Sequence, residues 1–429
     1  MSESNPSRSR QATFQCCAVL LLCLSGAVAA QTQPRPTLDE ALAQARLPLV
    51  VDEGGFSGAG APVLTQAIAQ SDFVLIGEDH VTREIPQFTA ALCDVMHPDA
   101  FAVEAGPDAA RFVSGLLRRP DRVALMAARM QAHPNNLAFL DIREENDLAA
   151  HCAAASRNPD FRLWGLDQEF LGASGTLLEA MLATAPGPKS RAAIADAQTK
   201  DRLADQQARD SGDPGKAWLL AATAADLQAL RAAIAADGLP ATQSLLLELI
   251  ASNEIYRLNA TGSPDSNQVR AELFKQHFIA EYAAAQKQIP RPRVLLKFGD
   301  NHMGKGFSVL HVRDLGNLVA ERADELQTHS LHILVLGARG THAAFAGYGK
   351  PLGSAPFVMT DDPDYAWMAP AVSALLAPKD AAGKPTLTLF DLRQLRFHGV
   401  ALPRDWERTV YGYDLLVLIP ELTPGSAID

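Results

Sequence analysis

Carboxylates and histidines follow four apolar segments of the chain, each at the point where a segment ends. In chain order they are Glu78, Asp79, His80, Glu104, Asp167, Glu169, Asp300 and His302. A neutral imidazole can take a proton from water near pH 7, and a neighbouring carboxylate fixes its tautomer and raises its basicity. Two histidines and a carboxylate can instead hold a divalent metal with an open position for water. Both arrangements activate water, and the residue types fit both.

The segments that precede these residues are short and rich in branched side chains. They lack apolar–polar alternation and end in glycine or a carboxylate, which predicts strands buried on both faces. Between most of these segments the apolar residues recur at helical spacing, as at 85–96 and 146–155. This alternation indicates the strand–helix repeat of a parallel α/β sheet. The predicted strands span 72–77, 100–106, 161–167, 293–299, 331–337, 386–392 and 413–420.

Residues 173–290 do not follow this strand–helix repeat. They are rich in alanine and leucine at helical spacing and contain no convincing strand. Breaks such as APGPKS, SGDPGK and GSPDSN favour a compact helical cap over a coiled coil. We therefore predict an α/β fold with a mostly parallel sheet flanked by helices and a large all-helical insertion. The two parts of the core are then 31–172 and 291–429.

The polar residues at the strand ends are expected to share one site. In parallel α/β sheets, sites form outside the carboxyl ends of the strands, where the following loops converge. We expect Glu78, His80, Glu104 and His302 to line one crevice within about 10 Å of one another, and these four are the candidate catalytic residues. If the site depends on a metal, His80, Glu104 and His302 are the candidate ligands.

Six other ionisable residues are weaker candidates, because ordinary roles account for them. Helix capping is an ordinary role for either aspartate. The two cations that lie three residues after a histidine could stabilise an oxyanion, but surface solvation is the ordinary role for both. The arginine in the insertion lies beside an apolar stripe on its helix, so we leave it outside the predicted site. The six are Asp79, Asp167, Arg83, Lys305, Arg270 and His342.

Several other reaction classes lack their motif. The chain has no G-x-S-x-G, no H-E-x-x-H, no P-loop, and no G-x-G-x-x-G between a strand and a helix. Its formal net charge of -11 makes it a poor candidate for binding nucleic acid. A small-molecule or peptide substrate is the remaining expectation.

Four motifs, taken in order, resemble the erythromycin esterase, ChaN and Tiki superfamily. They are LIGEDHVTREIPQF, FAVEAG, LLKFGDNHMGKG and YDLLVLIPELTP. The superfamily is similar in having a strand that ends in a Gly-Glu-x-His type motif, a glutamate after the second strand and a histidine after a late strand. The resemblance covers most of the chain after the N-terminal segment, although each motif is short.

The resemblance assigns site roles to five positions. Gly77 and His80 match the glycine and histidine of the first motif, Glu78 the adjacent acid, Glu104 the second-strand glutamate and His302 the late histidine. Erythromycin esterases hydrolyse a macrolide lactone through a histidine-activated water, Tiki-type members are metal-dependent peptidases and ChaN-type members bind haem. One residue separates Glu78 from His80, where the esterases usually have two.

The resemblance therefore implies a hydrolase of an ester, lactone or peptide bond, with or without a divalent metal. The alternative that it implies is a periplasmic haem- or iron-binding protein without catalysis. In that alternative His80 or His302 would be an iron ligand rather than a base.

The N-terminal segment has the layout of a secretory signal peptide. Arg8 and Arg10 precede the apolar block CCAVLLLCLSGAVAA, so residues 1–30 are expected to be removed on export to the periplasm or the medium. The block is shorter than the roughly 20 residues that span a bilayer, so no stable membrane span is expected after cleavage. Cys93 and Cys152 then remain, and they fit a disulfide or two buried thiols equally.

Overall fold

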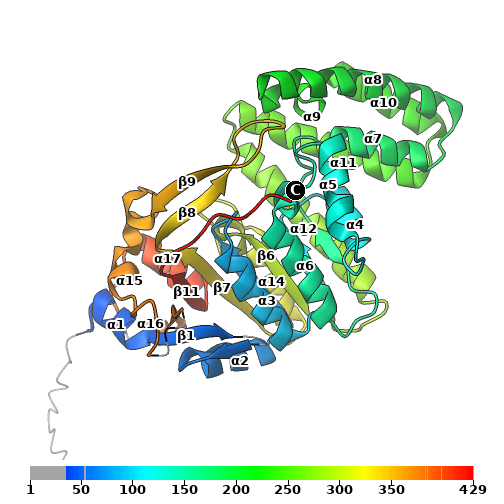
Figure 1. Cartoon of the computed structure of the whole chain (residues 1–429). Helices are drawn as coiled ribbons and strands as arrows, with labels where there is room; N and C mark the ends of the chain where they lie inside the picture. The colour runs from blue at the N-terminus through cyan, green and yellow to red at the C-terminus, as the bar shows by residue number, and fades with distance from the viewer. Residues whose placement is uncertain (1–34, 53–54, 382, 384, 398, 429) are drawn as a thin grey trace, which may run out of the picture. The chain divides into compact units, whose positions relative to one another are not determined.

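A mixed sheet forms the centre of the fold (Figure 1). The computed structural model describes residues 35–428 except 53, 54, 382, 384 and 398, so the predicted signal peptide 1–30 lies outside the described residues. Within them, nine strands are ordered β2-β1-β10-β11-β7-β3-β6-β4-β5. The strands from β11 to β5 run parallel, and β2, β1 and β10 form an antiparallel edge. The α/β prediction is confirmed.

The seven predicted strands are all present, and two strands at the antiparallel edge were missed. The nine strands are β1 (Arg46–Asp52), β2 (Gly55–Ser57), β3 (Phe73–Glu78), β4 (Ala100–Val103), β5 (Leu163–Gly165), β6 (Val294–Gly299), β7 (Ser330–Gly337), β10 (Leu387–Asp391) and β11 (Leu415–Ile419). The central strands β3, β4 and β6 are buried along their whole length, which explains their continuous apolar runs. An additional hairpin of β8 (Arg339–Ala344) and β9 (Gly353–Val358) was also missed.

Helices cover both faces of the sheet (Figure 1). Successive side chains of a strand point to opposite faces, so Val74 and Ile76 pack in one core cluster and Phe73 and Leu75 in the other. The first cluster includes residues of α2 (Gly60–Ala69), α3 (Glu84–Met96) and α6 (Arg143–Ala155). The second includes residues of α12 (Asp265–Ala285), α14 (Leu315–Glu325) and α17 (Arg404–Gly412).

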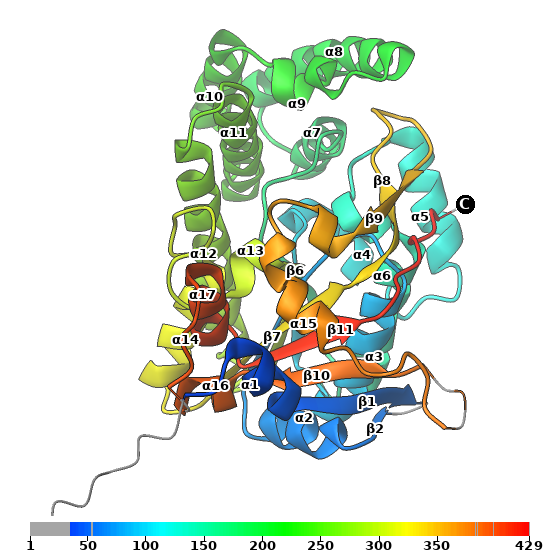
Figure 2. The same ribbon diagram turned by 90° about the vertical axis from the view of Figure 1, so that its left-hand side faces the viewer.

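The regular elements between β5 and β6 in the described chain are all helices, as the sequence predicted. They include α7 (Ser174–Ala183), α8 (Pro188–Ser211), α9 (Trp218–Ala221), α10 (Ala224–Asp237), α11 (Pro240–Ala260) and α12. Most of these helices share a core cluster of their own, and Figure 2 shows α8 and α10 away from the sheet. By contrast, α12 packs on the sheet through Phe274, Phe278 and Tyr282. It therefore joins the insertion to the strand ends.

The remaining helices are short or lie at the periphery. They are α1 (Leu38–Ala45), α4 (Pro107–Ser114), α5 (Arg122–Ala132), α13 (Asp300–Met303), α15 (Ala369–Ser373) and α16 (Arg393–Phe397), with 3-10 turns that include η1 (Ala138–Asp141). None of the helices in the described part of the chain combines the length and apolarity that a bilayer crossing needs.

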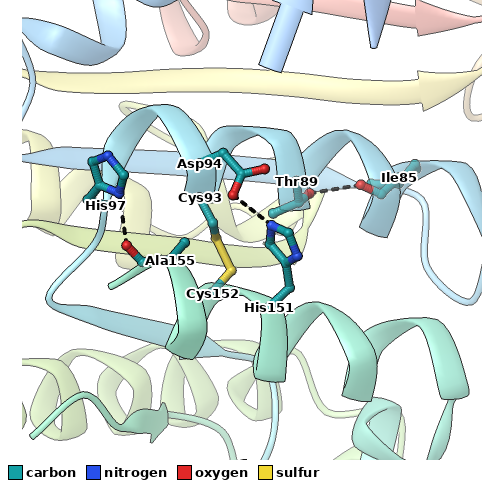
Figure 3. Close-up of a disulfide and its surroundings, with 8 residues drawn as sticks. All are labelled: Ile85, Thr89, Cys93, Asp94, His97, His151, Cys152 and Ala155. Atoms are coloured by element: carbon teal, nitrogen blue, oxygen red, sulfur yellow. Dashed lines mark hydrogen bonds and ion pairs between the residues drawn. A yellow bond between two sulfur atoms is a disulfide. The ribbon is translucent and has the colours of Figure 1, made fainter. Parts of the chain in front are cut away.

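A disulfide joins α3 to α6 on one face of the sheet (Figure 3). Cys93 and Cys152 have Cα atoms 5.2 Å apart and are bonded, which decides between the two alternatives that the sequence left open. Beside the bridge, His151 Nε2 lies 2.8 Å from Asp94 Oδ1, and His97 Nδ1 lies 2.8 Å from the carbonyl oxygen of Ala155. The two helices are thus tied together at neighbouring turns.

Loss of this bridge should destabilise the protein. The bridge closes a loop of 59 residues, so replacing both cysteines by alanine should lower the free energy of unfolding by about 2–4 kcal/mol, mainly by freeing the unfolded chain. Urea unfolding of the wild type with and without dithiothreitol measures the effect, and the double variant should not respond to the reductant. Identical unfolding of the wild type under both conditions would contradict the expectation.

Candidate functional site

The four residues predicted for the site lie together at the carboxyl ends of β3, β4 and β6. His80 Nδ1 is 2.9 Å from Glu78 Oε1, and His80 Nε2 is 3.2 Å from Glu104 Oε2. His302 Nε2 is 3.7 Å from the other oxygen of Glu104. Three of the four side chains are buried, and that of His80 is 25% exposed. The imidazole of His80 is therefore the member of the group that solvent reaches most easily.

The register of β3, β4 and β6 places these residues side by side at one edge of the sheet. Glu78, the last residue of β3, pairs with Gly299 at the end of β6, and Val103 at the end of β4 pairs with Lys297 two residues earlier on β6. Glu104 follows Val103 directly, and its carboxylate accepts a 2.7 Å hydrogen bond from the N–H of Gly299. The carboxyl ends of three adjacent parallel strands thus supply one cluster.

The glycine that ends β6 leaves room for the cluster. A Cβ atom on Gly299 would lie 2.9 Å from His80 Nε2 and 3.5 Å from Glu104 Oε2. A side chain at this position would therefore displace the imidazole from its carboxylate partner. Lack of space for a side chain therefore explains why the FGDNH motif has glycine at position 299.

A buried lysine that the sequence analysis did not consider pairs with Glu78 of the cluster. Lys297 lies in the centre of β6 with a side chain only 3% exposed. Its Nζ is 2.5 Å from Glu78 Oε1 and 2.6 Å from Glu145 Oε1. Glu78 therefore stands between two cationic partners, Lys297 and His80. A lysine inside a strand predicted to be buried on both faces was the signal that could have identified it.

Arg270 belongs to the site, contrary to the sequence-based expectation. Its Nη2 is 2.7 Å from Glu104 Oε1 and 2.5 Å from Asp167 Oδ2, and its Nη1 is 3.5 Å from His302 Nε2. The apolar stripe of α12 does pack on the sheet, as expected. However, Arg270 lies one turn before Phe274, and this places the guanidinium over the strand ends. Asp167 is therefore a partner of Arg270 and does not cap a helix.

His302 is fixed by a carboxylate on its other ring nitrogen. Its Nδ1 is 2.8 Å from Asp314 Oδ2, and Asp314 is the N-cap residue of α14. Its ring also packs nearly perpendicular to that of Phe274, with centroids 5.0 Å apart and an interplanar angle of 84°. These contacts direct Nε2 toward Glu104 and Arg270.

The other candidates from the sequence lie outside this cluster. Arg83 pairs with Glu144 at 3.2 Å and is 46% exposed, and Lys305 pairs with Asp414 at 2.9 Å. Neither cation contacts the four predicted residues, so the oxyanion role considered for them is not supported. His342 Nδ1 lies 3.9 Å from Asp79 Oδ2, which makes this aspartate an ion-pair partner and not a helix cap. Glu169 accepts a hydrogen bond from the N–H of Asp108 at the start of α4.

The two carboxylates set the charge of His80. Burial opposes protonation of the ring, but Glu104 and Glu78 outweigh it and raise the pKa of His80 to about 10. Burial also favours the neutral form of Glu104, yet the charges of His80, His302 and Arg270 hold the pKa of this carboxyl well below its usual value. At neutral pH the pair is therefore an imidazolium and a carboxylate, and not the neutral imidazole that the sequence suggested.

The cluster does not fit a divalent metal. Within the described residues, no three His, Cys, Asp or Glu side chains converge as metal ligands. The guanidinium of Arg270 occupies the position between Glu104 and His302 where a cation would bind. The contacts of Arg270 therefore favour proton transfer over metal ligation at this cluster.

Comparisons with known proteins bear on the fold. No protein-family model and no curated protein matches the chain. A succinoglycan biosynthesis protein of known structure superposes with a TM-score of 0.55 at 12% identity, over 91% of this chain and 98% of the other. A mutant of erythromycin esterase EreC in its open conformation superposes with a TM-score of 0.52 at 14% identity, over 86% of this chain and 95% of the other. The chain thus has an erythromycin esterase-like fold.

Proposed function

We propose that this chain is an exported hydrolase that activates water at His80 to cleave an ester, lactone or peptide bond. The observation that carries the proposal is the position of the His80 ring between Glu78 at 2.9 Å and Glu104 at 3.2 Å. Likeness of the fold to that of erythromycin esterase EreC supports the same reaction class. The substrate is proposed to be a small molecule or a peptide.

Each residue of the cluster has a role in this mechanism. Neutral His80 takes a proton from water while Glu78 holds the ring through Nδ1, and the resulting hydroxide attacks the carbonyl carbon. The oxyanion of the tetrahedral intermediate is stabilised by the positive charge of Arg270, beside His302. When the intermediate collapses, the leaving group takes the proton from the His80 imidazolium. Glu104 aligns His80, Arg270 and the end of β6.

Export is part of the proposal. Residues 1–30 have the pattern of a signal peptide, and the Cys93–Cys152 disulfide is typical of proteins that fold in an oxidising compartment. We therefore propose a periplasmic or secreted location. The acidic net charge of -11 supports a substrate other than nucleic acid.

An activity screen tests the proposal. Full-length protein expressed with its N-terminal segment would be recovered from the periplasm and the medium, its intact mass determined, and its activity assayed against esters, lactones and peptides. We expect turnover that persists after chelation by EDTA, because the cluster does not fit a metal. Absence of turnover across the panel, together with haem uptake seen as a Soret band, would overturn the hydrolase in favour of the haem-binding alternative.

The pH dependence of the reaction should report the charge of His80. A general base works only when deprotonated, and with a pKa of about 10 only about one molecule in a thousand has a neutral His80 at pH 7. The value of kcat/KM should therefore rise from pH 7 toward pH 10. Glu78→Gln removes one carboxylate that favours the imidazolium, so the pKa of His80 should fall and the rising limb should move to lower pH.

A distant carboxylate provides the control for this profile. Asp121 pairs with Arg119 on the surface, so Asp121→Asn should leave the limb in place. A profile that is flat from pH 7 to pH 10 in the wild type would contradict the role of His80 as a base and would favour a charged hydrogen-bond donor.

A further inference from the structure

The ring of His80 is stacked on Phe139, and each ring adjoins a residue in an unfavourable backbone conformation. The two ring centroids are 4.0 Å apart and the ring planes are inclined by 13°. Val81, after His80, has φ +59°, and Ala138, before Phe139, has φ +48°. A left-handed conformation is unusual for any residue with a side chain and most of all for a β-branched one. Such conformations persist only where the surrounding structure holds them.

One segment contacts the loops that carry both rings. Residues Leu422–Ile428 follow β11 and are called the strap here; in Figure 1 they form the red segment that runs from the sheet toward α6. Leu422 anchors one end, since it is buried, its N–H donates to the carbonyl of Arg339 at 2.9 Å, and its carbonyl accepts from the N–H of Thr341 at 3.0 Å. Ile428, also buried, anchors the other end.

The first half of the strap holds the His80 loop. The N–H of Gly425 donates to the carbonyl of Val81 at 3.0 Å, and the N–H of Arg83 donates to the carbonyl of Thr423 at 3.0 Å. The backbone N–H of Thr423 also donates to Glu84 Oε2 at 2.8 Å. These bonds fix the strained peptide that follows His80.

The second half of the strap holds the loop that carries Phe139. The N–H of Arg143 donates to the carbonyl of Ser426 at 2.7 Å, and the N–H of Ser426 donates to Glu144 Oε2 at 2.8 Å. At the end of the strap, the N–H of Ile428 donates to the carbonyl of Asp141 at 3.3 Å. The strap therefore bridges two loops that are about 60 residues apart in sequence.

We infer that the strap is a positioning element of the site: by bonding the Val81 and Asp141–Glu144 backbones together, it keeps His80 stacked on Phe139 and aligned between its carboxylates. The inference rests on the proposed function for its kinetic consequence. Its structural consequence, the stacking of the two rings, can be measured without any substrate.

Gly425 is the point at which the strap can be tested. A Cβ atom there would lie 2.7 Å from Cγ2 of Ile142 and 3.2 Å from the carbonyl oxygen of Val81, so the glycine lets the strap lie against both loops at once. Gly425→Ala should force the strap away from one of them. Gly115→Ala is the matched control, because Gly115 has φ -65° and its nearest Cβ contact would be at 3.4 Å.

The test combines an NMR readout with kinetics. In full-length protein with ¹³C-labelled histidine, stacking on Phe139 should shift the His80 ring protons upfield, with the signal assigned from His80→Ala. Gly425→Ala should lose this shift and lower kcat by roughly 10- to 100-fold through misplacement of the ring, whereas Gly115→Ala should change neither. If Gly425→Ala does not fold, Ser426→Ala provides the milder test, because it removes only the side-chain bonds to Glu144 and Arg83.

The outcomes distinguish a failure of the strap inference from a failure of the proposed function. An unchanged ring shift in both strap variants would overturn the inference, whatever the activity. A lost shift with unchanged kcat would also overturn it, because the strap would then have no positioning role in the reaction. If the wild type shows no activity on any substrate, the proposed function fails, and the ring shift alone decides whether the strap holds the stacked pair.

Discussion

His80→Ala should lower kcat by about 10²–10⁴-fold while the KM changes little. The imidazole acts mainly in the transition state, because proton transfer from water occurs there, so its removal should appear in kcat and not in substrate affinity. Glu104→Gln should give a similar loss in kcat at high pH, where His80 is neutral in both proteins, since it keeps the shape of the side chain but removes the charge that aligns His80 and Arg270. Steady-state kinetics on the best substrate of the panel measure both effects.

The chain offers a matched control for the histidine. His151 also pairs with a carboxylate, Asp94 Oδ1 at 2.8 Å, but lies on α6 beside the disulfide. His151→Ala should leave kcat within about twofold of the wild type, because surface substitutions away from a site rarely matter. Wild-type turnover retained by both His80→Ala and Glu104→Gln would contradict the mechanism. An inactive wild type whose Soret band disappears in His80→Ala or His302→Ala would instead identify a haem ligand.

The sequence predicted the candidate residues because they follow from strand direction. Apolar runs buried on both faces identify parallel strands, and parallel strands place the residues that follow them at one edge. Glu78, His80, Glu104 and His302 could therefore be grouped without knowing the strand order. Their catalytic roles stay a prediction, since the geometry shows only that they meet.

The parts that the sequence did not reveal depend on tertiary contacts. Arg270 is brought to the site by the packing of α12 on the sheet, which periodicity does not specify. The charge of His80 depends on two carboxylates that face its two ring nitrogens, so its residue type alone suggested a neutral base. The strap was missed because Thr423, Gly425 and Ser426 act mainly through backbone hydrogen bonds that leave no motif.

Lys297→Met should lower the free energy of unfolding by about 3–5 kcal/mol, the usual cost of removing one partner from a buried ion-paired group. Lys297 Nζ neutralises Glu78 at 2.5 Å and Glu145 at 2.6 Å, and all three side chains are less than 10% exposed. Methionine fills a similar volume, so the loss would come from the carboxylates left without their cation and not from a cavity. Urea unfolding at pH 7 measures it, with Arg291→Met, which breaks an exposed pair to Asp72, expected to cost about 0–1 kcal/mol.

The pH dependence of this variant should identify the cause of its instability. Burial already raises the pKa of Glu145 to about 7, despite the opposing charge of Lys297, and removing the lysine should raise this pKa further. A carboxyl whose pKa is higher in the folded state binds more protons there than in the unfolded state, so stability rises as the pH falls. The deficit of Lys297→Met should therefore be smaller at pH 5 than at pH 8, and Glu145→Gln in the same chain should recover part of it. A deficit that is equal at both pH values would instead assign the loss to packing around β6 and would contradict the role of Lys297 as the counter-charge of the site.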